Sequence, residues 1–343
     1  MTDNMDRRES IKNVMRGERS ERIPRAVFGG GRWALRQAGL RIEDLKDDPI
    51  DFGDRIADVF SSLDTDMVFA GSGLNSFPAE AIGGVLAFDE KQAPLLSFPI
   101  IEKSSDAKGL DTIDISHSPY TAALVEMIAR LRKCLPDRFI CVTSWGPFTW
   151  AMILCDWNSL QDKIVTDRPF VNEICELGIR LSQALITTLA DSDLIDGISI
   201  PDGATTLVPD DIYHDVILPA EKKLFAFAKD KGLTTIFHQC GEIKRQLELY
   251  PEAGADCISI DNSVKLSDAH KLWGDKVVLA GNVDVINTVL GGTPDKICNA
   301  VRESLDGLPD PFINYIMMPS CDLPPDTPLK NVEAFLKCAD DQS

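Results

Sequence analysis

The feature that most restricts the fold of this chain is a repeated alternation of short apolar runs with longer amphipathic stretches. Short continuous apolar runs are typical of strands buried on both faces of a parallel sheet. Eight such units in succession predict a (β/α)8 barrel, the TIM-barrel form of the α/β class, with an open doubly wound sheet as the alternative. The runs cover residues 26–28, 67–70, 139–143, 197–200, 234–237, 257–260, 277–280 and 313–317.

Between the runs, apolar residues recur every three or four positions, which predicts helices. The helical segments are 119–134, 168–191, 211–231 and 242–252, and a short charged helix is expected over 6–16. No linker-like segment divides the chain, so residues 1–343 are expected to form one barrel domain. Residues 1–24 would be an N-terminal extension. Residues 71–118, rich in glycine and proline, would be an insertion after the second strand that lies over the barrel mouth.

The charge balance excludes some classes of partner. Acidic residues number 54 and basic residues 35, a formal net charge of −19. Such a surface repels phosphate backbones and anionic lipids, which argues against nucleic-acid and membrane partners. No apolar run approaches the roughly 20 residues of a membrane span, and the charged N-terminus does not resemble a signal peptide. We therefore expect a cytoplasmic protein.

Nine cysteines at irregular spacings do not resemble the disulfide framework of a small secreted protein. We expect a reducing compartment in which most of them are small buried apolar residues. Cys257 would lie inside the sixth strand, and Cys175 and Cys298 on helical faces.

Two apolar runs end in residues that bind soft metals. His238 and Cys240 follow the fifth run and, two positions apart in an extended segment, point the same way. Cys321 follows the eighth run, and the ends of barrel strands meet at one mouth. Two thiolates and an imidazole suit zinc, and three protein ligands leave a fourth position open, as in catalytic sites. The alternative is that each residue only packs the core, but their placement at two strand ends favours zinc.

Other polar residues at the predicted strand ends are candidates for substrate binding or for support of the metal ligands. The alternative for each is that it only stabilises a turn or caps the N-terminus of a helix. These candidates are Asp202, Asp261, Asn282 and Asp284. Trp145, with the nearby Phe148 and Trp150, would line a surface for a flat ligand or close the core. Gly29-Gly30-Gly31 lacks the spacing of a nucleotide-binding loop.

Several motifs together make the chain resemble the uroporphyrinogen decarboxylase superfamily, and within it the corrinoid-dependent methyltransferases of the methylcobamide:coenzyme M type. The resemblance covers nearly the whole chain. It rests on AEAIGG at 79–84, GPFT at 146–149, HQCG at 238–241, GNVD at 281–284 and SCDLPPDTPLKNVEAF around Cys321. In that branch the residues matching His238, Cys240 and Cys321 bind zinc.

A second motif, WALRQAG at 33–39, is similar to a signature of the true uroporphyrinogen decarboxylases. Leu40 stands where that signature has a second arginine. Phe69-Ala70-Gly71 stands where those enzymes have a phenylalanine, a serine and an aspartate, so the carboxylate they need is missing. The decarboxylases also use no metal, which would leave the three candidate ligands without a role.

The resemblance implies a zinc-dependent methyltransferase of one-carbon metabolism. It would move a methyl group between a corrinoid, supplied by a corrinoid protein or as free cobalamin, and a small acceptor. A zinc-bound thiol is deprotonated, and the thiolate would attack the methyl group on cobalt. Three alternatives stay open: a corrinoid-linked demethylase of the O-demethylase type, a uroporphyrinogen decarboxylase, and a non-catalytic corrinoid- or metal-binding module. The sequence leaves the donor, the acceptor, the direction of transfer and the oligomeric state open.

Overall fold

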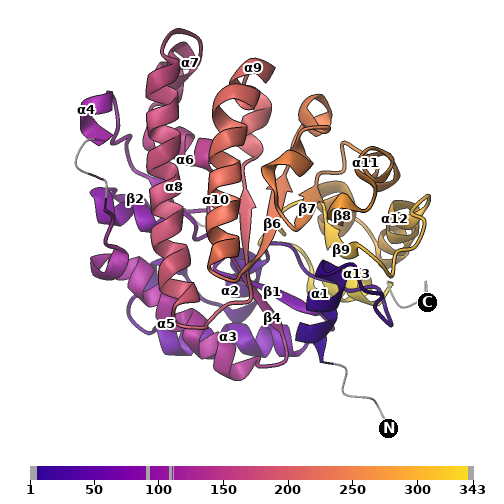
Figure 1. The fold of residues 1–343 in the computed structure, drawn as a ribbon. Coiled ribbons are helices and arrows are strands. Elements are labelled where there is room, and N and C mark those ends of the chain that lie inside the picture. Colours follow the sequence, from indigo (N-terminus) through magenta and orange to yellow (C-terminus); the bar gives the residue numbers. More distant parts are fainter. Residues whose placement is uncertain (1–5, 90–92, 108–109, 111, 339–343) are drawn as a thin grey trace.

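A parallel, curled sheet of seven strands forms the centre of the molecule, in the order β1-β4-β5-β6-β7-β8-β9. The computed structural model describes residues 6–89, 93–107, 110 and 112–338. Figure 1 shows the helices arranged outside the sheet. The strands are β1 Met67–Ala70, β4 Phe139–Thr143, β5 Gly197–Pro201, β6 Thr234–Gln239, β7 Cys257–Ile260, β8 Val278–Val283 and β9 Tyr315–Pro319.

The expected first strand over 26–28 is wrong in extent. Only two isolated parallel bridges occur there, from Arg25 to Met317 of β9 and from Ala26 to Met67 of β1. The reason is local: Pro24 has no N–H to donate, and Gly29 and Gly30 turn the chain at positive φ. Residues 24–26 therefore touch both edge strands of the sheet without forming a strand.

Helices connect most of the strands and cover the outside of the sheet (Figure 1). Their apolar stripes pack on the strands, as amphipathic helices do. The main ones are α2 Gly31–Ala38, α3 Pro49–Ser61, α5 Pro119–Cys134, α6 Pro147–Leu154, α7 Trp157–Thr166, α8 Arg168–Ala190, α10 Leu218–Asp230, α11 Leu266–Trp273, α12 Pro294–Leu305 and α13 Leu329–Lys337. Thr293 caps α12 by accepting a hydrogen bond from the Lys296 N–H.

Two helix predictions differ from the structure. The segment 242–252 holds two 3₁₀ turns, Ile243–Gln246 and Tyr250–Ala253, instead of one helix. Pro251 cannot donate a helical hydrogen bond, and Gly254 at φ 85° ends the segment. In the segment 211–231, the short helix α9 Asp210–Ile212 and a π-helical turn, Tyr213–Ile217, come before α10.

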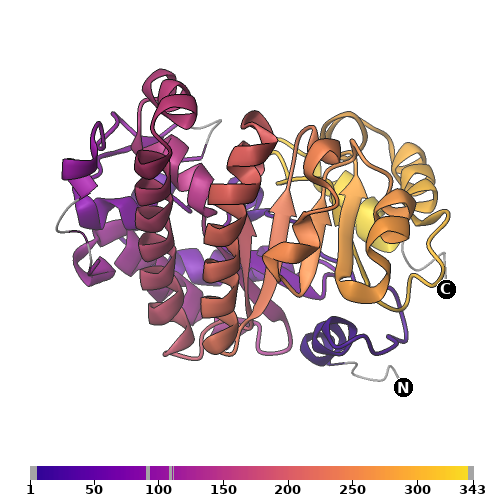
Figure 2. The ribbon, with the colours of Figure 1, turned by 45° about the horizontal axis from the view of Figure 1, so that its top comes forward.

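The N-terminal helix α1 Arg7–Met15 lies against the ends of β1 and β4 where those strands begin. Asp6 caps it through the N–H groups of Arg8 and Glu9. Its Ile11 and Val14 join an inner apolar cluster with side chains from most of the strands, including Ile236 of β6. Figure 2 shows α1 at the lower side of the sheet. Side chains of α1 thus help to fill the interior of the curled sheet from this end.

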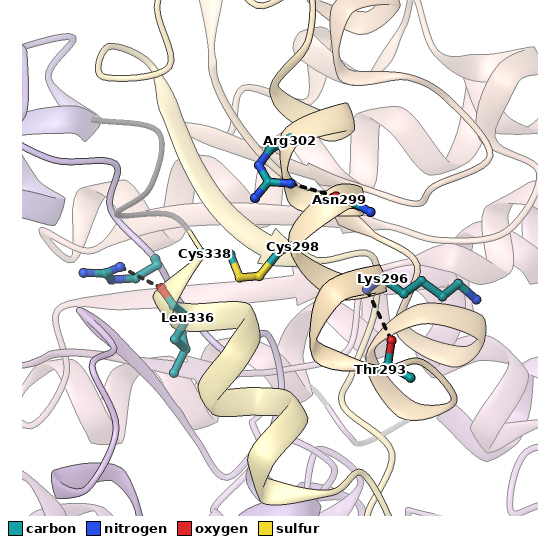
Figure 3. The surroundings of a disulfide bond; sticks show 8 residues. Thr293, Lys296, Cys298, Asn299, Arg302, Leu336 and Cys338 are labelled. Atoms are coloured by element: carbon teal, nitrogen blue, oxygen red, sulfur yellow. Dashed lines mark hydrogen bonds between the residues drawn. A yellow bond between two sulfur atoms is a disulfide. The ribbon is translucent and has the colours of Figure 1, made fainter.

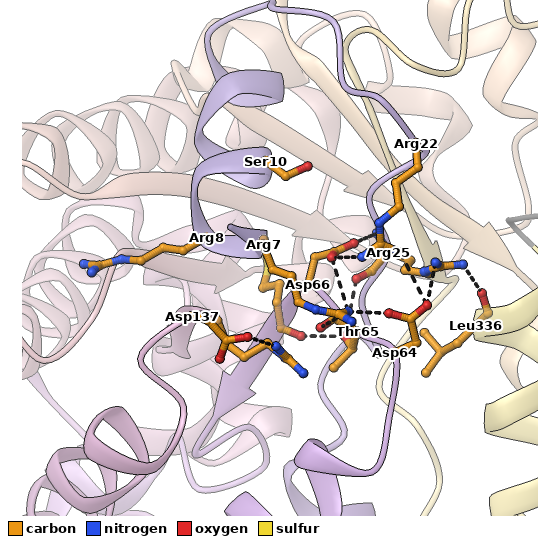
Figure 4. Close-up of polar contacts among 12 residues, drawn as sticks. Arg7, Arg8, Ser10, Arg22, Arg25, Asp64, Thr65, Asp66, Asp137 and Leu336 are labelled. Carbon is orange, nitrogen blue, oxygen red and sulfur yellow. Dashed lines mark hydrogen bonds and ion pairs between the residues drawn. The ribbon is translucent and has the colours of Figure 1, made fainter. Parts of the chain in front are cut away.

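A buried ion network ties the N-terminal segment to this same end (Figure 4). Arg25 pairs with Asp64 at 2.6 Å and donates to the carbonyl of Leu336 at 2.6 Å. Its backbone N–H donates to Asp66 at 3.0 Å, and Asp66 also pairs with Arg22. Burial raises the pKa of Asp66 in spite of its arginine neighbours. The network joins residues before the sheet to β1 and α13.

The described part of residues 71–118 contains five short elements. These are the 3₁₀ turns Phe77–Ile82 and Ile115–His117, strands β2 Leu86–Ala87 and β3 Leu95–Leu96, and helix α4 Ser104–Ala107. The two strands pair antiparallel and form a sheet of their own. Leu95 and Leu96 reach a cavity that Cys240 also lines, so this part of the segment lies beside the carboxyl ends of the strands.

Cysteine pairing differs from the sequence-based expectation at one place. Cys298 of α12 forms a disulfide with Cys338, at the end of α13, with the two Cα atoms 5.2 Å apart (Figure 3). These positions are 40 residues apart and meet because α12 and α13 pack together. Cys175 and Cys257 are unpaired and fully buried, as predicted. Within the described ranges, the helices are too short or too polar to cross a membrane.

Candidate metal centre

His238, Cys240 and Cys321 come together at the carboxyl end of the sheet. One ligand atom from each lies within 4.8 Å of the other two. His238 is near the end of β6, Cys240 directly follows that strand, and Cys321 follows β9. Strands β6 and β9 are not neighbours in the sheet, so the curl of the sheet brings these residues together. The structure brings the three predicted side chains together.

The imidazole of His238 is held in a buried position, with 2 % of the residue exposed. Its Nδ1 lies 3.0 Å from the hydroxyl oxygen of Ser259 on β7, and its ring stacks on Phe28 with centroids 4.2 Å apart. Its Nε2 has no hydrogen-bond partner among the described residues. A buried polar atom without a partner costs roughly 1–3 kcal/mol. A metal at Nε2 would satisfy this atom, so the donor set fits a cation.

The two thiols of the triad interact directly. The thiol of Cys321 donates a hydrogen bond to Cys240, which lowers the pKa of Cys240. The same bond, together with burial, raises the pKa of Cys321 well above its ordinary value, although the nearby His238 imidazole acts in the opposite direction. The pair therefore holds one proton more tightly and the other less tightly than free cysteines do. A bound cation displaces such protons, because thiolates are the ligands.

Two glycines are required by close approach near the triad. A Cβ on Gly203 would lie 2.6 Å from the sulfur of Cys240, so any larger residue there would displace the Cys240 side chain. Gly29, at φ 63°, has no room for a Cβ because Asp322 fills the space. The N–H of Gly30 donates to Asp322 at 2.8 Å. The glycine run at 29–31 thus holds a buried carboxyl next to Cys321, a role that its spacing alone did not indicate.

Asp202 is fully buried and its carboxylate is used by the protein itself. It accepts hydrogen bonds from the N–H of Phe148 at 3.2 Å and from the N–H and hydroxyl of Thr149 at 2.6 and 2.7 Å. These contacts cap α6. Its own N–H donates to the carbonyl of His238 at 3.2 Å. Burial raises the pKa of Asp202 to about 6.

Glu221, a residue that the sequence analysis missed, lies behind Asp202. It is fully buried in α10, accepts a hydrogen bond from the Tyr213 hydroxyl at 3.0 Å, and shares a proton with Asp202. Burial and the Asp202 carboxylate raise the pKa of Glu221 well above its ordinary value. A usable signal was present: Glu221 is an acidic residue on the face of α10 that also carries Leu218 and Leu224.

The other three predicted polar residues mainly hold loops. Asp261 accepts from the N–H of Gly241 at 3.2 Å and so holds the turn that follows Cys240. The Asn282 side chain donates to the carbonyls of Asp261 at 3.0 Å and Val264 at 2.6 Å. Asp284 caps the turn that begins at Val285. Their proposed contacts with a substrate stay predictions.

Trp145 is the predicted residue that lies in the wall of an open cavity. The cavity has a volume of about 690 Å³ and reaches the triad at Cys240. The indole N–H of Trp145 donates to the hydroxyl of Ser76 at 3.0 Å, which holds the ring in place. Phe148 and Trp150, the other two predicted aromatics, are fully buried and close the core.

The family model for uroporphyrinogen decarboxylase (URO-D) matches residues 6–342. The chain belongs to the uroporphyrinogen decarboxylase family. This family assignment agrees with the resemblance seen in the motifs, and the matched range includes His238, Cys240 and Cys321.

Some relatives that match this chain carry the names of methyltransferases, and others carry the name uroporphyrinogen decarboxylase. A methylated-thiol–coenzyme M methyltransferase of Methanosarcina mazei is 25 % identical over 76 % of this chain and 69 % of its own length. A methylcobamide:CoM methyltransferase of Methanosarcina acetivorans is 23 % identical over 76 % of each chain. The solved structure of a methyltransferase from Methanosarcina mazei superposes with a TM-score of 0.83, covers 98 % of both chains and is 19 % identical. This structural match shows that the two proteins share a fold.

Proposed function

We propose that the protein is a zinc-dependent methyltransferase that moves a methyl group between a corrinoid and a small sulfur or oxygen compound. The observation that carries this proposal is the meeting of His238, Cys240 and Cys321, with the buried Nε2 of His238 left without a partner in the described structure. Zinc bound there would keep a coordinated substrate thiol deprotonated near neutral pH.

Residues around the triad would orient its ligand atoms and keep water away from them. The Ser259 hydroxyl fixes the orientation of His238 and favours the tautomer that leaves Nε2 as a ligand. The Phe28 ring covers one face of the imidazole and excludes water. Cys240 and Cys321 would both bind as thiolates, and Gly203 allows the chain to pass close to Cys240. Three protein ligands leave one position for a substrate.

The corrinoid comes into the proposal through the relatives, whose names refer to methylcobamide. We propose that it is presented at the carboxyl end of the sheet, by a corrinoid protein or as free cobalamin. We also propose that the enzyme is cytoplasmic and has no nucleic-acid or membrane partner. Its chain would form one barrel domain, in which residues 24–26 complete the barrel and residues 71–118 lie over the mouth.

Three alternatives differ in how well they fit the features of this site. The apolar cavity beside Cys240 would also suit a methylated donor, which favours the demethylating direction as the second candidate. The decarboxylase alternative is disfavoured because Phe69-Ala70-Gly71 supplies no carboxylate and because it gives the triad no role. A binding module without turnover would keep zinc and transfer no methyl group.

The test combines metal content with turnover. We expect about one zinc ion per chain in wild type, lost in Cys321→Ala together with methyl transfer from methylcobalamin to thiols. Cys134→Ala, a half-buried cysteine at the end of α5, is the matched control and should keep both properties. Zinc without transfer in either direction would leave the binding module. Absence of zinc from wild type, prepared under reducing conditions with zinc supplied, would contradict the proposal.

A further inference from the structure

The cavity that reaches the metal triad has a largely apolar wall. Six side chains from β3, the loop after it, the loop after β4, and α6 make up much of this wall: Leu95, Leu96, Pro99, Trp145, Met152 and Ile153. Its volume of about 690 Å³ is within the range of about 300–1,000 Å³ that is typical of small-molecule sites. The space is therefore large enough for an organic substrate whose reacting atom lies at Cys240.

The same wall offers no positive charge to a substrate. Among the described residues that line the cavity there is no lysine, arginine or histidine, and the only carboxylate is that of Asp156. Asp156 caps α7 through the N–H of Ser159 at 2.9 Å. Arg245 reaches the carbonyl of the lining residue Thr206, but it pairs with Asp210 at 2.9 Å and donates to Val208 as well.

We infer that the small substrate of this site is an uncharged molecule with an apolar alkyl or aryl body, and not an anionic thiol. An anionic group taken into this cavity would lose its hydration and meet apolar side chains and one carboxylate, which opposes binding. An apolar body would instead displace water from Trp145, Met152 and Ile153. The inference rests on the proposed function, because it assigns the substrate class of that same site.

The test is calorimetric titration of the zinc-loaded full chain with matched pairs of thiols. The first pair is 1-propanethiol and 2-mercaptoethanesulfonate, and the second is benzyl mercaptan and 4-(mercaptomethyl)benzoate. We expect each uncharged thiol to bind at least about tenfold more tightly than its anionic partner. Benzyl methyl ether, titrated into the zinc-free chain, should still bind, because the apolar wall does not depend on the metal.

Three variants test whether the cavity wall causes the preference for uncharged over anionic thiols. Met152→Lys places a cation in the wall and should shift the preference toward the anionic thiols. Val165→Lys adds the same charge to an exposed position of α7, where the residue is 74 % exposed, and should leave the preference unchanged. Ala204→Phe fills the cavity and should weaken binding of every uncharged probe.

The outcomes separate the two proposals. Equal or tighter binding of the anionic thiols by wild type, or no binding of any uncharged probe, would overturn the inferred substrate class while methyl transfer could still be intact. If the protein bound uncharged probes preferentially but transferred no methyl group, the result would support the inferred substrate class and contradict the proposed methyltransferase activity.

Discussion

The Nδ1 of His238 lies 3.0 Å from the hydroxyl oxygen of Ser259, so one hydroxyl on β7 determines how the imidazole on β6 presents its other nitrogen. The register of the two strands makes this contact, because His238 is directly opposite Ser259 in the β6–β7 pair. Both side chains lie in the interior and both residues are at most 2 % exposed.

Ser259→Ala should weaken zinc binding while the fold is kept. Loss of the hydroxyl frees the ring to rotate and to change its tautomer, and loss of such a supporting contact typically costs about 10–100-fold in metal affinity. Competition with a chromophoric chelator measures the affinity, and circular dichroism checks the fold. An unchanged affinity would mean that packing against Phe28 alone orients His238.

Gly203→Ala should reduce metal content because the new methyl group would lie 2.6 Å from the Cys240 sulfur. The control is Gly232→Ala, at φ 79° and with no atom within 4 Å of the added Cβ. That change strains the backbone, at a cost of about 1 kcal/mol, and leaves the site alone. Zinc content of the two variants, measured at equal folded fraction, distinguishes a steric effect at the site from general destabilisation.

Arg25→Met should lower the free energy of unfolding by roughly 1–3 kcal/mol, because it leaves the buried carbonyl of Leu336 without its side-chain donor and removes the pair with the half-exposed Asp64. Arg19→Met removes an ion pair whose side chains are 57 % and 36 % exposed. It should cost only about 0–1 kcal/mol. Urea unfolding of both variants gives the comparison. Similar losses in the two variants would show that the network in Figure 4 contributes no more than a surface pair.

Glu221 should make the protein less stable as the pH rises. Its pKa is raised in the folded state, so the folded chain holds a proton that the unfolded chain releases above the ordinary carboxyl range. The stability gained from this proton is fully present below the unfolded pKa and is lost as the pH rises toward the folded pKa. Glu221→Gln should flatten this dependence in urea unfolding between pH 4.5 and pH 8, whereas Glu252→Gln, at an exposed ion pair, should not.

Cys298→Ser should lower the free energy of unfolding by about 2–4 kcal/mol, because the disulfide with Cys338 closes a long loop, with a sequence separation of 40. Reduction of wild type with dithiothreitol should give the same loss, and the variant should not respond to the reductant. Equal stability of oxidised and reduced wild type would argue against a structural role for the cross-link.

Sequence reasoning succeeded where one local pattern determines one element. The runs 139–143 and 257–260 coincide with β4 and β7, because a continuous apolar run fits a strand buried on both faces. It failed at residues 26–28, where two bridges join different partners, and at 242–252, where Pro251 interrupts the helical pattern. The two bridges depend on how close the curl of the sheet brings β1 and β9 to this segment, and that distance has no local signal in the sequence.

The triad was predictable because His238 and Cys240 share a face by strand geometry and because barrel strands end at one mouth. The residues that support it were not, since Ser259 depends on register between strands and Asp322 on the approach of the Gly29–Gly30 turn. Cys298 and Cys338 are brought together by the packing of α12 and α13, which spacing along the chain does not encode.

The position of Cys321 after β9 has a consequence for synthesis on the ribosome. His238 and Cys240 emerge together, but the third ligand follows only when the last strand of the sheet has been made, and Arg25 and Ala26 must then be in place to bridge β9 and β1. The growing chain therefore has no complete triad until Cys321 has emerged after β9, and binding of one metal ion by all three side chains would be possible only from that point on.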